Sequence, residues 1–146
     1  MGTITTSMCN SFKQEILGGV HALATHTLKL ALIKPSPTVT YGAATTNYSD
    51  ITGNSDEATG TNYTAGWQNL DSATITLSGT TAFVDFADEV FSNLTISAGG
   101  AIIYNSSASN KAIAIFAFSS TVSSTAGEFT LIFHTADASN AVIRIT

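Results

Sequence analysis

The sequence has little charge. Only 10% of its 146 residues are Asp, Glu, Lys or Arg, against about a quarter in an average protein. Five basic and 10 acidic residues give a formal net charge of −5. Five scattered basic residues cannot neutralise a run of phosphates, so we expect no nucleic-acid partner. No apolar run approaches the about 18 residues of a membrane-spanning helix, so we also expect no membrane association.

Cysteine and proline are nearly absent as well. The single cysteine, Cys9, cannot form an internal disulfide and has no neighbours at metal-ligand spacing. The first residues, Met1 to Ser7, show no cationic segment followed by an apolar one, so we expect no secretory signal. Both features favour folding in a reducing cytosol.

Hydroxyl and apolar side chains take the place of the missing charge. The chain holds about 40 Ser and Thr and is 44% hydrophobic, which is the reverse of a disordered composition. Residues 10–23 show the one helical pattern. Ser11 and Gln14 are spaced as a capping box, and an apolar stripe begins at Phe12. We predict a short amphipathic helix of about three turns here, docked on a sheet.

The rest of the chain alternates with the period of β-strands. We predict strands at 28–33, 73–78, 82–86, 94–104, 111–118, 129–133 and 141–145, with Gly99–Gly100 as a bulge. The fold class is therefore mainly β: an antiparallel β-sandwich or barrel with one short N-terminal α-helix. We expect one domain over residues 1–146, with 1–10 a candidate flexible arm and 35–70 a long loop region.

The acidic residues and histidines offer weak candidates for chemistry. Asp85, Asp88 and Glu89 form the densest acidic cluster, which we interpret as a solvent-facing strand end. A second oxygen-rich stretch, residues 50–57, lacks the spacing of a calcium loop and is interpreted as a solvated turn. His21 and His26 would not share a helix face and lack a third ligand, so we expect surface or half-buried histidines.

Motifs of the common catalytic classes are missing from the sequence. There is no Gly-x-Ser-x-Gly nucleophile elbow and no glycine-rich phosphate loop followed by a lysine and a helix. We therefore predict that the protein is not an enzyme, has no catalytic or metal-binding residues and uses no cofactor.

Four aromatic residues stand out in the long loop region: Tyr41, Tyr48, Tyr63 and Trp67, with asparagines nearby. Such side chains can anchor a protein interface or stack on sugar rings. They can equally cover a sheet from a long loop. The sequence leaves these interpretations open, and we take the four residues as the candidate partner interface.

Three segments carry a family resemblance. They are Ser11 to His21 with Leu28 to Leu32, then Gly60 to Gly66, and then Phe83 to Asp88 running on to Gly100 to Asn105. Together they resemble small virion proteins of tailed bacteriophages, especially those infecting aquatic bacteria.

The resemblance implies a role in the virion after synthesis in the host cytoplasm. A capsid decoration (cement) protein is the leading expectation. Its implied partners are the major capsid protein and copies of itself, as a trimer or dimer. A tail or fibre component that binds host surface carbohydrate is the alternative. The resemblance brings no catalytic residues.

Overall fold

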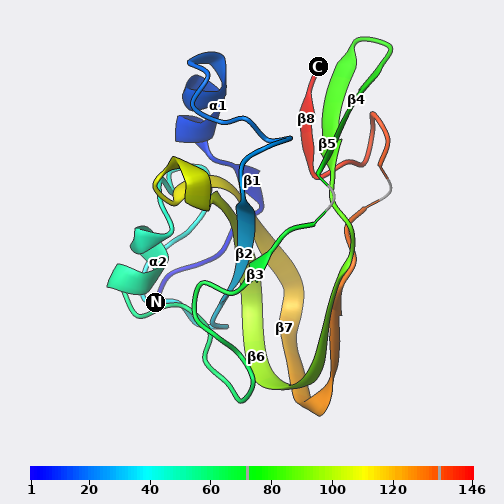
Figure 1. Ribbon diagram of the computed structural model, residues 1–146. Coiled ribbons are helices and arrows are strands. Elements are labelled where there is room, and N and C mark those ends of the chain that lie inside the picture. The colour runs from blue at the N-terminus through cyan, green and yellow to red at the C-terminus, as the bar shows by residue number, and fades with distance from the viewer. Residues whose placement is uncertain (72, 135) are drawn as a thin grey trace.

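The computed structural model, which describes residues 1–71, 73–134 and 136–146, is mainly β (Figure 1). Two antiparallel sheets have the strand orders β1-β7-β6-β2-β3 and β4-β5-β8. The strands are β1 (Ser7–Met8), β2 (Leu28–Ile33), β3 (Gln68–Asn69), β4 (Thr74–Ser78), β5 (Thr81–Asp85), β6 (Glu89–Asn105), β7 (Lys111–Leu131) and β8 (Ile143–Ile145). The helices are α1 (Asn10–Leu17), α2 (Ser49–Gly53) and a 3-10 turn at Ser106–Ala108. The predicted mainly β class with a short N-terminal helix is confirmed.

The long hairpin of β6 and β7 organises the molecule. The first half of this hairpin is the half next to its turn, and it contains the end of β6 and the start of β7. It joins β1 and β2 in the large sheet. Its fully buried side chains include Ile102, Ile103, Ile113 and Ile115. Its second half bends back, as Figure 1 shows at the bottom of the view. Residues of this second half belong to the same hydrophobic core; they include Phe91, Leu94, Ile96 and Phe129. One bent ribbon therefore supplies two walls of one core.

The largest shift in the pairing of β6 with β7 falls between the two halves, at Gly99, where the pairs Ala98–Val122 and Gly100–Ala117 leave one residue of β6 opposite four of β7. A Cβ on Gly100 would come within 2.3 Å of the Phe116 carbonyl oxygen, and one on Gly99 within 2.8 Å of the Pro35 Cα. Only hydrogen fits at these two positions. The predicted bulge at Gly99–Gly100 is confirmed.

The helix is shorter than the predicted 10–23 segment. It ends at Leu17 because Gly18 caps it and Gly19 adopts a left-handed φ of +73°. The predicted capping box is wrong: Cys9 is the N-cap and makes no side-chain capping bond, while the buried Ser11 hydroxyl has no hydrogen-bond partner among the described residues.

The prediction of separate strands at 111–118 and 129–133 is also wrong. β7 runs without interruption from Lys111 to Leu131, and β6 pairs with it on both sides of an irregularity at residues 118–121. The intervening Ser- and Thr-rich stretch shows no apolar alternation, and its side chains are largely exposed. Ser97 and Ser123 nonetheless join the two strands by a 2.7 Å hydrogen bond between their hydroxyls.

Residues 1–10 and 35–70 are both hydrogen-bonded to the rest of the chain and to each other. The Gly2 N–H donates to the Pro37 carbonyl at 2.8 Å, and the Thr5 N–H donates to the Tyr41 carbonyl at 2.9 Å. β1 pairs with β7, and β3 pairs with β2. The first ten residues and the long loop region thus lie against the large sheet.

Replacing Gly100 by alanine is expected to destabilise the fold by about 1–3 kcal/mol, because the new methyl group would press on the Phe116 carbonyl oxygen and on Ile4. The free energy of unfolding can be measured by urea denaturation. Gly53→Ala is the matched control, since a Cβ there meets nothing within 4 Å. Equal stability of the two variants would contradict the role of Gly100 in the bend.

Candidate functional site

The first of the four predicted aromatics, Tyr41, is fully buried and points at a carboxylate. Its hydroxyl donates to Asp56 Oδ2 at 2.8 Å. Asp56 is itself 0% exposed, accepts the Thr38 N–H at 2.8 Å and pairs with Lys34 Nζ at 2.7 Å. Burial alone would raise the pKa of Asp56, but the bonds from Lys34 and Thr38 outweigh it and hold the pKa well below its ordinary value. The interpretation of this stretch as a solvated turn is wrong at Asp56.

Glu57 gathers the next two aromatics. Its carboxylate accepts the hydroxyl hydrogens of Tyr48 and Tyr63, the latter at 2.8 Å, and the Gly66 N–H at 2.7 Å. The Tyr63 oxygen also accepts the Leu32 N–H at 2.9 Å, which fastens the loop to the inner strand β2. One half-buried carboxylate therefore closes the loop region onto the large sheet.

Ring contacts complete this cluster. Tyr48 stacks on Tyr104 with 4.4 Å between ring centroids. Trp67 packs against Tyr63 at 4.1 Å and against Phe91 at 4.2 Å, and its indole N–H donates to Gln68 Oε1 at 2.6 Å. Burial raises the pKa of each tyrosine, that of Tyr104 to about 12.

The structure therefore brings the predicted residues together in two groups around carboxylates. Tyr41 is 1% exposed, whereas Tyr48, Tyr63 and Trp67 are half-buried. The role of these four residues as a partner interface stays a prediction. The hydrogen bonds and ring contacts of the two groups hold residues 35–70 on the large sheet.

A polar cluster at the carboxyl-terminal end of β6 is not apparent from the sequence. His21 Nε2 lies 2.9 Å from Glu15 Oε2, and Glu15 also pairs with Lys111 Nζ at 2.7 Å. The Asn105 side-chain nitrogen lies 3.0 Å from His21 Nδ1 and 2.9 Å from His26 Nδ1. His21 is 5% exposed, so its expected surface or half-buried position is wrong, whereas the half-buried His26 agrees with that expectation.

This polar cluster holds α1 and the following loop on the β6–β7 turn. Burial would raise the pKa of Glu15, but the hydrogen bonds from Lys111 and His21 outweigh it and lower the pKa. Its partners lie up to 96 positions apart in the sequence, so no local motif could have revealed them.

The acidic cluster at residues 85–89 is dispersed in the structure. Asp88 accepts the Phe133 N–H at 2.9 Å, and Asp85 is half-buried at the end of β5. Glu89 is 5% exposed rather than solvent-facing, and burial raises its pKa. The described residues contain no group of three or more His, Cys, Asp or Glu side chains that could hold a metal ion. Within the same residues, no helix is both long and apolar enough to cross a membrane.

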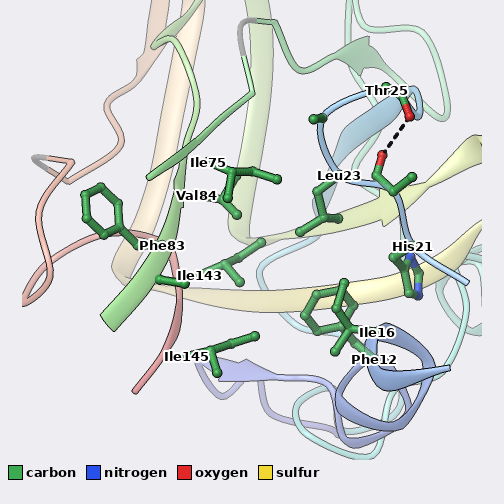
Figure 2. A pocket seen from close by; sticks show the side chains of 13 residues that line it. Phe12, Ile16, His21, Leu23, Thr25, Ile75, Phe83, Val84, Ile143 and Ile145 are labelled. Atoms are coloured by element: carbon green, nitrogen blue, oxygen red, sulfur yellow. Dashed lines mark hydrogen bonds between the residues drawn. The ribbon is translucent and has the colours of Figure 1, made fainter. Parts of the chain in front are cut away.

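The structure adds a feature that the sequence did not predict: an apolar cleft of about 360 Å³ between α1 with the following loop and one face of the small sheet. Figure 2 shows Phe12, Ile16 and Leu23 on one side of this space and Ile75, Val84, Ile143 and Ile145 on the other. We call these seven residues the apolar cleft. The Phe83 side chain points to the other side of β5.

The rim of the apolar cleft carries large exposed apolar side chains. Leu17 is 90% exposed and lines a second hollow, of about 300 Å³, with Phe12, Ile16 and Ile145. On the small sheet, Ile75 is 52% exposed and Leu77 71% exposed. Alternation in the sequence assigned Ile75 and Leu77 to the apolar face of a strand. It could not show that this face is left partly uncovered.

Comparisons with known proteins add no relative to this picture: no family model, no curated protein and no solved structure matches the chain.

Replacing Glu57 by glutamine is expected to lower the free energy of unfolding by about 1–3 kcal/mol, because an amide offers one acceptor oxygen where three donors converge. Urea denaturation measures the change. Glu128→Gln, at an exposed position with one 3.2 Å bond to Thr130, is the matched control and should leave stability nearly unchanged. Equal stability of both variants would show that the Glu57 cluster does not secure the loop.

The raised pKa values of all four tyrosines predict a delayed alkaline titration. Burial favours the neutral phenol in the folded state, so the stabilisation is full below the ordinary tyrosine pKa of about 10 and is lost as pH rises above it. Tyrosinate absorbance should therefore appear only together with the loss of β-sheet circular dichroism. A tyrosine that ionises reversibly near its ordinary pKa in the folded protein would contradict the burial of these hydroxyls.

Proposed function

We propose that this protein is a structural component of a tailed-bacteriophage virion, a capsid decoration (cement) protein that binds the major capsid protein. Two observations support the proposal: the resemblance of three sequence segments to small virion proteins, and the apolar cleft with its exposed rim. The cleft carries the argument from the structure, because exposed apolar side chains around an apolar hollow are typical of protein interaction sites. Leu17, Leu77 and Ile145 are the most exposed parts of this rim.

The low charge supports the same proposal. A protein that coats a shell in many copies buries much of its surface against other protein. Charged side chains on such a surface would have to be desolvated, which is unfavourable unless each one finds a partner. Here the buried carboxylate of Asp56 and the half-buried carboxylate of Glu15 are paired within the chain. The rim offers mainly apolar groups, whose burial contributes about 25 cal/mol per Å².

A carbohydrate-binding tail or fibre component is the second candidate, and it draws on Trp67 and the tyrosines of the long loop region. The geometry supports it less well. The hydroxyls of Tyr48 and Tyr63 donate to Glu57, and the Trp67 ring packs on Tyr63 and Phe91. A stacking platform for sugar needs an aromatic face turned to solvent.

Purified protein mixed with expanded shells that lack it is expected to bind saturably, in hundreds of copies per particle, and to raise the temperature at which the shells break. Leu17→Lys should weaken binding about tenfold or more by placing a charge on the rim, a loss of about 1.4 kcal/mol. Ile132→Lys, at a 73% exposed position outside the apolar cleft, is the control with the same charge change. Absence of saturable binding, with glycan binding instead, would favour the tail candidate.

A further inference from the structure

β4 forms the outer edge of the small sheet, and the described residues place no further strand beside it. β4 is the last strand of the order β4-β5-β8, and all five of its residues are exposed. Ser78 pairs with Thr81 across the two-residue turn Gly79–Thr80, where Gly79 has a φ of +59°. Such a turn is closed by a hydrogen-bonded pair, and bonded pairs alternate along an antiparallel ladder. Ile75 and Leu77 therefore direct their backbone N–H and C=O groups away from β5.

This edge has none of the features that usually block strand pairing. Its sequence, Thr-Ile-Thr-Leu-Ser, contains no charge, no proline and no bulge. The other edge strands in the described part of the chain differ. β1 and β3 are two residues long, and β8 carries Arg144, which would face its own copy across a twofold axis.

We propose that two copies of this protein pair β4 to β4, antiparallel, about a twofold axis at Thr76. In this register Ile75 lies opposite Leu77 of the partner, and Leu77 lies opposite Ile75 of the partner. Each of these two pairs exchanges two backbone hydrogen bonds, so the outward groups of both residues are all satisfied. We choose this register because it places the outward N–H and C=O groups of Ile75 and Leu77 opposite those of the partner.

The side chains favour the same register. Ile75 and Leu77 continue the apolar face of the small sheet, so apolar side chains of the two copies lie next to each other. Thr76 lies on the other face, opposite Thr76 of the partner, and Thr–Thr pairs are favourable across strands. Because the strand is uncharged, a twofold axis brings no like charges together. The alternation of polar and apolar residues in Thr-Ile-Thr-Leu-Ser is symmetric about Thr76, so a second copy matches this strand at every position and is the occupant we propose.

The size of the contact sets its strength. Two five-residue strands bury much less than the about 1,200–2,000 Å² of a stable interface, so pairing in solution should depend on concentration. Copies crowded on a shell would be held close enough to pair. The inference thus deepens the proposed function and rests on it for that crowding, whereas the pairing itself can be tested in solution.

Cysteine cross-linking tests the register directly. Cys9, the single native cysteine, is 0% exposed, so we expect only a cysteine introduced on β4 to form disulfides between copies. Thr76→Cys would place two thiols in a non-hydrogen-bonded pair, whose about 4.5 Å Cα separation suits a disulfide. Under mild oxidation at high protein concentration we expect covalent dimers to form about tenfold faster than in Ser78→Cys. Ser78 lies opposite Thr74 of the partner and is the matched control.

A second substitution removes the pairing without touching the core. Leu77 is 71% exposed, so Leu77→Lys should not disturb the fold, and an edge lysine opposes strand addition. Added to Thr76→Cys, it should reduce cross-linking to the rate of Ser78→Cys. Circular dichroism of each variant verifies that the β-sheet is intact.

The outcomes separate this inference from the proposed function. Equal cross-linking of the Thr76 and Ser78 variants, in solution and on shells, overturns the β4 pairing. If the protein still binds shells in that case, the proposed function stands alone. Cross-linking specific to Thr76 supports the pairing even if no shell is bound. If Thr76→Cys stays monomeric both in solution and on shells, pairing with a second copy is overturned, and any loss of shell binding in Leu77→Lys is then assigned to the exposed position of Leu77 beside the apolar cleft.

Discussion

The bend of the β6–β7 ribbon is the constraint on which the rest of the structure depends. A flat hairpin of this length would leave one face of its second half in water, with Phe91 and Phe129 exposed. At Gly99–Gly100 the strand approaches the Phe116 carbonyl and Pro35 so closely that no side chain fits. That approach lets the ribbon fold back, so that both halves cover one core. β2 then pairs with the first half, and the long loop region covers the second through Trp67.

Few charges are present, and three of the carboxylates each bind side chains or backbone groups of several other segments. Asp56 joins Thr38, Tyr41 and Lys34, and Glu57 joins Tyr48, Tyr63 and Gly66. Glu15 joins α1 to β7 through Lys111. Each carboxylate offers two oxygens to several donors, which lets one residue hold segments that have no regular secondary structure. Although the sequence has few charged residues, these three carboxylates each stabilise contacts between several segments.

Local patterns in the sequence predicted the elements whose signal is itself local. The alternation of Leu28, Leu30 and Leu32 gave a strand, and Ser78–Gly79 gave the β4–β5 turn. The continuity of β7 could not be predicted, since its Ser- and Thr-rich centre is set by pairing with β6 rather than by an apolar pattern. The carboxylate clusters and the His21–Asn105 contact join residues distant in sequence. The apolar cleft depends on how two elements are spaced, which no periodicity encodes.

The pairing of β1 with β7 has a consequence for how the chain acquires its fold. Ser7 meets Ile115, and the Cys9 N–H donates to the Ile113 carbonyl at 2.9 Å. During synthesis the first strand and α1 leave the ribosome long before their partner is made, and Met8 and Phe12 are then without cover. The amino-terminal segment can bond to residues 37–43 as soon as these are made, but the pairing of β1 is completed only after β7 in the carboxyl-terminal half of the chain has been made.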